Sequence, residues 1–283
     1  MIHTHHTYPS SRFLTLYVLV VIFLYGCQGT PRVETAEVVE TLNNFPSLDQ
    51  ALEMSAVRYY SGKSSTVTPQ LDVALEVKRN YDLILARREQ LEISKEVKGH
   101  FEKAADQAEK KFEAGDDDIS QSVITKLKLG LAGTLNDISR FNSDIALAKL
   151  HLEKYLGVRW AAEVDISGPK YQSVTFPHKT VGEFLKSNTS GSKTPKGAEL
   201  FNLREAIIEI NKVREQLALG RKNRKMTRAL LVTEAANYDF GIGNEADLFE
   251  SLIIYTRVLV GYFEAVHTFN VAVYRFHSLY PAK

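Results

Sequence analysis

The feature that most restricts the fold of this chain is a regular spacing of apolar residues in two long segments. In the first segment these residues follow one another at alternating steps of three and four, and only Thr134 departs from apolar character. A pattern sustained over more than four heptads is typical of helices that pack as coiled coils. Its positions are Ile124, Leu127, Leu131, Thr134, Ile138, Phe141, Ile145, Ala148, Leu152 and Tyr155.

The second segment repeats the pattern without an exception, and each segment follows a helical arm and a glycine-containing turn. Gly115 lies in the first turn and Gly241 and Gly243 lie in the second, and we expect left-handed backbone geometry at Gly115 and Gly241. We therefore predict a mainly α fold in which a long antiparallel α-helical hairpin occurs twice, as an internal repeat. The second set of positions is Leu248, Leu252, Tyr255, Leu259, Tyr262, Val266, Phe269, Val273, Phe276 and Tyr280.

The length of the arms has a consequence for packing. Arms of roughly 35–43 residues would be ~50–65 Å long at 1.5 Å per residue. A single hairpin of this length cannot cover its own apolar stripes, so we expect the two hairpins to pack side by side and against other copies of the chain. In the first arm the expected packing positions are Val97, Phe101, Ala104, Ala108 and Phe112.

Glycine, serine and proline residues, which favour turns and loops, divide the chain further. Ser47 is an expected N-cap of a short helix over 47–60, and Gly157 is an expected C-cap of the first hairpin. Within the insert we predict short strands at 164–166 and 171–176 and a flexible loop over 187–197. The predicted organisation is a signal peptide at 1–26, a tether at 27–46, a first repeat at 47–157 with its hairpin at 71–157, an irregular or β insert with a linker at 158–198, and a second hairpin at 199–283.

The N-terminus predicts export. An unbroken apolar run from Phe13 to Tyr25 follows a polar segment that ends in Arg12, and its 13 residues fall short of the ~20 that cross a bilayer as a helix. The run ends Leu24-Tyr25-Gly26-Cys27, which resembles the bacterial lipobox, and Cys27 is the only cysteine. We expect Cys27 to be lipidated, with a lipid-anchored protein on the periplasmic side of the outer membrane. The alternative is an ordinary signal peptide with an incidental cysteine.

Composition argues against several classes of protein. The net charge of +1 does not favour nucleic-acid binding. The histidines are scattered, without an HExxH motif or cysteine partners, and no phosphate loop, GxSxG motif or cysteine nucleophile is present. We therefore expect no enzyme activity, no metal and no cofactor. The basic group Arg221, Lys222, Arg224 and Lys225 is expected on a solvated face, or else against an acidic partner or lipid headgroup.

Two passages of the sequence resemble the TolC family of outer-membrane efflux proteins. The first comprises Lys111-Phe112-Glu113-Ala114-Gly115, Ile119-Ser120 and Leu152-Glu153-Lys154-Tyr155-Leu156-Gly157. The second comprises Ala236-Asn237-Tyr238-Asp239-Phe240-Gly241-Ile242-Gly243, Asp247-Leu248 and Phe269-Asn270-Val271-Ala272. They resemble the turns and closing helices of the two family repeats, in the same order. The resemblance covers most of 71–157 and 199–280.

This resemblance implies a homotrimer that forms a helical duct in the periplasm. It also implies docking with a periplasmic adaptor (membrane fusion) protein and an inner-membrane transporter. The chain departs from the family in one respect. Neither the linker before Leu71 nor the linker at 187–198 holds two alternating strands of ~10 residues, so we expect the strands of the family's membrane barrel to be missing.

The resemblance also assigns candidate site residues. Asp247 and Glu250 share a helix face and correspond to acidic residues that ring the periplasmic entrance, although acids in a first turn also complement the helix dipole. The turns at Gly115, Asp116, Gly241 and Gly243 correspond to the adaptor contacts of the family. Asp116 begins a run of three aspartates, which we interpret as a solvated, helix-starting cluster because the other spaced ligands of a calcium site are lacking.

Three hypotheses follow from these observations. The first is a TolC-like component of a tripartite efflux or secretion system. The second is a periplasmic coiled-coil scaffold lipoprotein that conducts nothing. The third, an enzyme with its site in the 158–198 insert, would require a pocket there and has the least support. Copurification with an adaptor protein would distinguish the first two.

Overall fold

The computed structural model describes residues 40–61, 70–161, 164, 170–188 and 195–280. The predicted signal peptide, Cys27 and most of the predicted tether lie outside these residues, as do 62–69 and 189–194 of the two linkers. The described part contains six helices and two short strands. In chain order they are β1 (Glu40–Leu42), α2 (Leu48–Ser61), α3 (Gln70–Glu113), α4 (Gln121–Leu156), β2 (Val158–Trp160), α5 (Val181–Asn188), α6 (Ala198–Asp239) and α7 (Glu245–Leu279).

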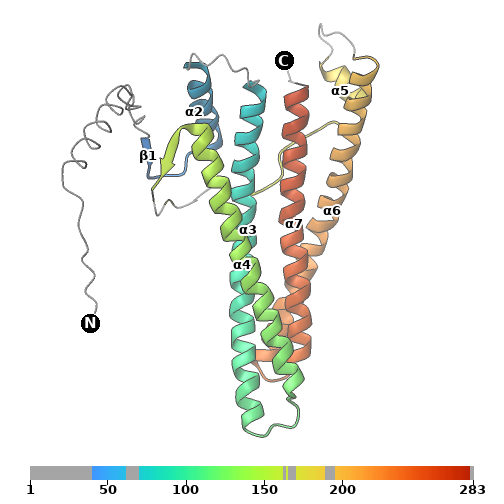
Figure 1. Cartoon of the computed structure of the whole chain (residues 1–283). Helices are drawn as coiled ribbons and strands as arrows, with labels where there is room; N and C mark the ends of the chain where they lie inside the picture. Colours follow the sequence, from blue (N-terminus) through green and yellow to red (C-terminus); the bar gives the residue numbers. More distant parts are fainter. Residues whose placement is uncertain (1–39, 62–69, 162–163, 165–169, 189–194, 281–283) are drawn as a thin grey trace, which may run out of the picture. The chain divides into compact units, whose positions relative to one another are not determined.

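Four long helices form two antiparallel hairpins that lie side by side (Figure 1). Helices α3 and α4 make the first hairpin, α6 and α7 make the second, and α3 also packs along α7. By these contacts the helices follow the order α4, α3, α7, α6, while the part of α4 near the turns crosses α3 and also contacts α7 (Figure 1). The predicted mainly α fold with two long hairpins is confirmed.

The apolar seams predicted from the sequence are largely covered within this one chain. Leu127, Leu152, Leu252 and Val266 have no exposed surface, because α3 packs against both α4 and α7. The expected side-by-side packing of the hairpins is thus confirmed, but these seams do not need a second copy to cover them. Phe112, predicted as a packing position, is instead 44% exposed.

Local capping signals define several helix ends as expected. Ser47 Oγ accepts a hydrogen bond from Gln50 N (3.2 Å) and Gln50 Oε1 accepts one from Ser47 N (2.8 Å), which makes a reciprocal capping box before α2. Ser120 caps α4, and Gly157 ends it with φ 72° while its N–H donates to Glu153 O. The three aspartates from Asp116 precede this cap, so they lie in the turn and not in the first turn of α4.

The insert between the hairpins differs from the prediction. The two described strands, β1 and β2, pair in parallel, whereas Tyr171–Phe176 is not a strand and Val164 is the one described residue of the other predicted strand. The segment 171–176 does not pair with a strand because its backbone bonds to side chains of α6 and α7. Helix α5 was not predicted, although Thr180 and Glu183 form a capping box at its start.

The end of the predicted tether is ordered against the first hairpin. Residues 40–42 form β1, and the Phe45 ring stacks on Tyr81 of α3 with 5.2 Å between ring centroids. The same ring lies 5.4 Å from Trp160 of β2. Residues 40–45 are therefore held against the helices through Phe45 and a strand pair.

Candidate functional site

The two hairpin turns carry most of the residues that the sequence marked as functional. Gly115 and Gly241 have φ of 80° and 73°, which confirms their predicted left-handed geometry. Gly243 is needed for a different reason, because an added Cβ would lie 2.9 Å from Asn237 Cβ and 3.0 Å from Tyr238 N. These glycines define the turns.

The second turn exposes large apolar side chains that the sequence analysis did not single out. Phe240 is 81% exposed and Ile242 is 78% exposed, more than any other large apolar side chain in the described part of the chain. With Phe112 at the end of α3 they give the turns an apolar surface. A turn that had only to reverse the chain would not need such residues.

An ion pair with a buried carboxylate joins the two turns. Lys111 Nζ lies 2.9 Å from Glu245 Oε1, whose side chain is only 7% exposed, and the same ammonium lies 5.6 Å from the centroid of the Tyr238 ring. Burial, and then the charge of Glu245, raise the pKa of Tyr238. Glu245 was overlooked because an acid in the first turn of a helix has the simpler explanation of complementing the dipole.

Removal of the cation from this pair should destabilise the turns. We expect Lys111→Met to lower the free energy of unfolding by about 1–3 kcal/mol, because the Glu245 carboxylate would be left buried without its partner. Chemical denaturation monitored by circular dichroism measures the change. Lys110→Met is the matched control, since Lys110 pairs with an exposed Asp106, and it should leave the stability essentially unchanged. Equal effects of the two variants would contradict this role of the pair.

Asp247 and Glu250 lie on the same groove between α6 and α7, together with Glu234. The groove is lined by Leu230, Glu234, Asp247, Glu250, Ser251 and Ile254. Within the described residues none of the three carboxylates forms an ion pair. Asp247 also takes part in the cap of α7, since its N–H donates to Asn244 Oδ1 (2.9 Å) and its Oδ2 accepts from Asn244 Nδ2 (2.7 Å). The capping role is therefore present, and Glu234 adds a third carboxylate that sequence spacing could not reveal.

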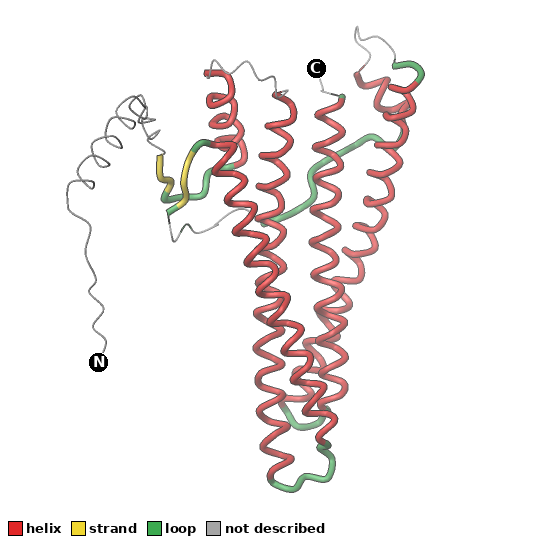
Figure 2. The backbone as a smooth tube through the Cα atoms, in the orientation of Figure 1, coloured by secondary structure: helices red, strands yellow, loops and turns green. Residues whose placement is uncertain are grey.

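A loop crosses one face of the helices, from the first hairpin to the second. We call residues 170–180 the belt, and Figure 2 shows it among the green loop segments running between helices towards α5. Asn270 of α7 holds it, because its Oδ1 accepts from Val174 N (2.8 Å) and its Nδ2 donates to Gln172 O (3.2 Å). Arg214 of α6 donates to the carbonyl oxygens of Phe176 (2.8 Å) and His178 (3.0 Å).

These contacts revise the prediction for the basic residues of α6. Arg221 Nη2 donates to Ser173 Oγ of the belt (2.8 Å), and the Arg224 guanidinium lies 4.8 Å from the centroid of the Tyr262 ring. Lys222 and Lys225 are exposed, as expected for a solvated face. The arginines of this group therefore hold the belt and α7, and the lysines face solvent.

Asp82 is the centre of a buried polar network beneath the belt. It is 3% exposed and accepts hydrogen bonds from Tyr171 Oη (2.5 Å), His267 Nδ1 (2.8 Å) and Asn270 Nδ2 (2.7 Å). Burial and then the Asp82 carboxylate raise the pKa of both Tyr171 and Tyr274. We call Asp82, Tyr171, His267 and Asn270 the Asp82 node. It joins α3, α7 and the belt.

A second polar cluster joins three helices. Arg87 of α3 donates from Nε to Asp144 Oδ2 of α4 (2.7 Å) and from Nη1 to the Glu264 carboxylate of α7. Gln90, which is fully buried, donates to Val260 O (2.9 Å). Burial opposes ionisation of Glu264, but the hydrogen bond and charge of Arg87 lower its pKa overall. This cluster fixes the first hairpin to α7.

The acidic groove opens on the face of α7 that points away from the belt. Glu250 and Asn270 are 20 residues apart in α7, and at 3.6 residues per turn this spacing is about five and a half turns, so the two residues point to opposite faces. Asn270 contacts the belt. Glu250 and its neighbour Asp247 therefore lie on the opposite, open face.

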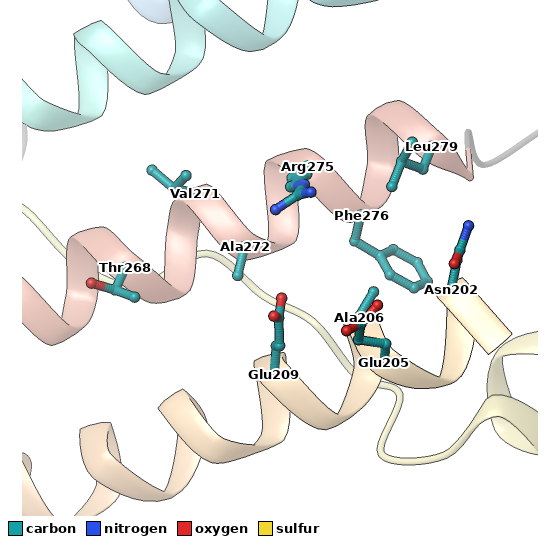
Figure 3. Close-up of a pocket in the computed structure, with 10 residues that line it drawn as sticks. All are labelled: Asn202, Glu205, Ala206, Glu209, Thr268, Val271, Ala272, Arg275, Phe276 and Leu279. Atoms are coloured by element: carbon teal, nitrogen blue, oxygen red, sulfur yellow. The ribbon is translucent and has the colours of Figure 1, made fainter.

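A wider groove lies near the other end of the same two helices (Figure 3). It has a volume of about 520 Å³ and is bordered by α6 and α7. Its lining residues are Asn202, Glu205, Ala206, Glu209, Thr268, Val271, Ala272, Arg275, Phe276 and Leu279. Phe276 of α7 lines the groove, and its ring also contacts other aromatic rings.

The outer helices carry exposed apolar residues. Along α6 such residues recur at steps of 7, 11, 7 and 4, which keeps them on one face of a helix. We call this set the α6 stripe, and it consists of Phe201, Ile208, Leu219, Met226 and Leu230, all exposed. Helix α4 exposes Leu129, Leu147 and Leu150 on its own outer face. These two surfaces are not covered by the described part of the chain.

Two features of the described residues concern membranes and metal ions. None of the described helices has an apolar stretch long enough to span a bilayer. Within the described residues, no group of three or more histidine, cysteine, aspartate or glutamate side chains is placed to hold a metal ion.

Comparison with known proteins identifies the fold. No family model matches the sequence, and no curated protein matches it. Solved structures do match it in fold, among them the following three. The outer-membrane channel OprN has a TM-score of 0.59 and 13% identity, over 83% of this chain and 70% of that one. CusC, described with transmembrane channel formation, has a TM-score of 0.54 and 10% identity over 82% and 70%. The CmeC outer membrane channel of Campylobacter jejuni has a TM-score of 0.54 and 11% identity over 82% and 66%. The chain therefore has the TolC-like helical fold of outer-membrane channels.

Proposed function

We propose that this chain is a TolC-like component of a tripartite efflux or secretion system, assembled as a homotrimeric helical duct. The observation that carries the proposal is the pair of exposed apolar surfaces on the two outer helices. An uncovered stripe along a whole helix is unusual on a protein that acts alone and marks an interaction surface. The likeness in fold to outer-membrane channels supports the same conclusion.

Exposed apolar residues on α4 and on α6 lie at similar distances from their hairpin turns. Leu129 lies 129 − 121 = 8 residues after the start of α4, and Leu230 lies 239 − 230 = 9 residues before the end of α6. At 1.5 Å per residue both are about 13 Å from their hairpin turns. Leu150 likewise lies 29 residues after the start of α4, and Ile208 lies 31 residues before the end of α6. The α4 face of one copy can therefore meet the α6 stripe of the next copy, which is a heterologous contact of the kind from which rings are built.

Such a ring would give the acidic groove a role. In this arrangement the belt lies outside and the open face of α7 lines the lumen. Asp247 and Glu250, with Glu234 beside them, would then form a ring of carboxylates at the entrance near the turns. A ring of this kind attracts cations, and the carboxylates within it repel one another.

The turns are the proposed docking surface for a periplasmic adaptor protein, beneath which an inner-membrane transporter would lie. Phe240 and Ile242 supply exposed apolar contact next to Gly241 and Gly243. In the first hairpin, Gly115 and Asp116 would contribute. Lipidation of Cys27 would hold the assembly at the outer membrane, with the helices facing the periplasm.

A cysteine pair tests the ring. In a chain whose Cys27 is replaced by serine, Leu129→Cys with Leu230→Cys introduces the only two thiols. Oxidation should yield linked species that end at three chains and return to single chains on reduction. Leu129→Cys with Val232→Cys is the control, because Val232 is exposed on α6 but away from the stripe. Absence of linkage, or a ladder that continues past three chains, would contradict the proposal.

A non-conducting scaffold lipoprotein is the second candidate, and one observation favours it. The predicted coiled-coil seams are covered within a single chain, so folding itself does not require a ring. Co-expression with the adaptor protein encoded nearest to this chain separates the two. A duct component should copurify with it as a ring and lose the adaptor when Phe240 and Ile242 are both replaced by serine. A scaffold should remain a single chain or dimer without a lumen.

A further inference from the structure

A cluster of aromatic rings attaches the belt and α5 to the end of α7. Phe276 of α7 lies 4.9 Å from both Phe176 of the belt and Phe184 of α5, measured between ring centroids. Tyr280 lies 5.3 Å from Phe276. We call these four residues the aromatic latch. Their rings meet mostly edge to face, a geometry worth about 0.5–1.5 kcal/mol per pair beyond area burial.

Two histidines lie at the border of the aromatic latch. The ring of His277 is 5.9 Å from Phe176 and 5.7 Å from Phe276. The ring of His178 is 5.4 Å from Phe176 and 5.4 Å from Phe184. Both histidines are half-buried. A charge acquired by His277 would therefore appear against apolar rings.

The surroundings of His277 disfavour its charged form. Burial, then the ammonium of Lys78 on α3, then His178 lower the pKa of the His277 imidazole. Arg214 of α6 adds another cation, with its guanidinium 5.8 Å from the Phe176 ring. The carboxylate of Glu183 accepts from Lys179 N (2.6 Å) and interacts with His178, while Glu199 lies near Tyr280, and Glu205 and Glu209 line the groove beside Phe276.

The lowered pKa of His277 determines how the latch responds to pH. At a pH well above the ordinary histidine value, the His277 imidazole is mostly uncharged whether the latch is closed or open. As the pH falls below about 6.5, the ordinary value for histidine, a solvated ring takes up a proton more readily than a ring held in the closed latch. Acid therefore shifts the balance towards the open latch, and the shift is complete once the pH is below the lowered value.

We propose that the aromatic latch is an acid-sensitive fastening, in which protonation of His277 releases α5 and the end of the belt from α7. The wide groove of Figure 3 borders the same ring of Phe276, so release would also loosen α6 from α7 at this end. This device does not depend on assembly into a ring.

Hydrogen exchange of the full chain tests the proposal. At about pH 7.5 and about pH 5, exchange is measured by mass spectrometry over peptides from 176–188 and corrected for the intrinsic pH dependence of exchange. We expect protection there to fall several-fold in acid. His277→Gln cannot take up the proton and should keep its protection at both pH values. His100→Gln, on α3 and away from the latch, should behave as the unaltered chain.

Two results would overturn the proposal. One is unchanged protection of 176–188 in acid, and the other is an acid response of the same size in His277→Gln. If that variant is already loose near neutral pH, His277→Phe restores an aromatic ring that cannot be protonated. An acid response in His277→Phe would then show that His277 is not the sensor, and its absence would support the proposal.

Discussion

Replacement of Leu219 and Met226 by glutamate should convert the assembled protein to single chains. Each apolar side chain contributes about 1.5–3 kcal/mol when it is buried, and the two carboxylates would also have to be desolvated without partners. The apparent dissociation constant should therefore rise by roughly a thousandfold or more. Both residues lie on the exposed α6 stripe, so the fold of the single chain should not change.

Sedimentation velocity over a range of concentrations measures this effect. Val232→Glu is the matched control, because Val232 is also apolar and exposed on α6 but lies about 140° from Leu219 around the helix at 100° per residue. It should leave assembly unchanged. An identical mass distribution for the double variant and the control would mean that the α6 stripe is not an interface.

Removal of the Asp82 carboxylate should produce the largest loss of stability of any single substitution considered. Asp82→Ala leaves the hydroxyl of Tyr171 and the Nδ1–H of His267 buried without an acceptor, and the side-chain amide of Asn270 keeps only its longer hydrogen bond to Gln172 O. We expect a loss of about 3–5 kcal/mol in the free energy of unfolding. The belt should be the first segment to lose protection, since Asn270 also holds its backbone.

Denaturant unfolding and limited proteolysis of the belt measure the two effects. Asp106→Ala is the control on the same helix, because Asp106 forms an exposed pair with Lys110, and it should cost less than about 0.5 kcal/mol. Asp82→Asn should lie between the two, since the amide keeps the shape and one acceptor. A loss below 1 kcal/mol for Asp82→Ala would show that the node does not hold the belt.

The long helices could be predicted because their signal is repeated many times. Ten seam positions at steps of three and four define α4, and ten more define α7. A single polar residue such as Thr134 therefore does not change the prediction of a helix. In the structure Thr134 is buried, and its hydroxyl donates to Gly130 O (2.9 Å). Turn glycines could be predicted for the same physical reason, because a positive φ restricts the choice of residue.

The contacts that fix the belt could not be predicted. The alternation of Tyr171–Phe176 indicates a strand, yet its partners are Asp82, Asn270 and Arg214, which are distant in sequence. The same holds for Glu234, which joins Asp247 and Glu250 only once α6 lies beside α7. Hydropathy also cannot distinguish the exposed α6 stripe from a buried seam, because both consist of apolar residues at helical spacing.

The mass of the lipid-free chain in dilute solution tests the central claim most directly. Native mass spectrometry or sedimentation equilibrium should give three times the mass of one chain if the outer helices of neighbouring copies meet and close a ring. A stable single chain at all concentrations, with the α6 stripe exposed and unpartnered, would contradict a duct and leave the scaffold as the better description.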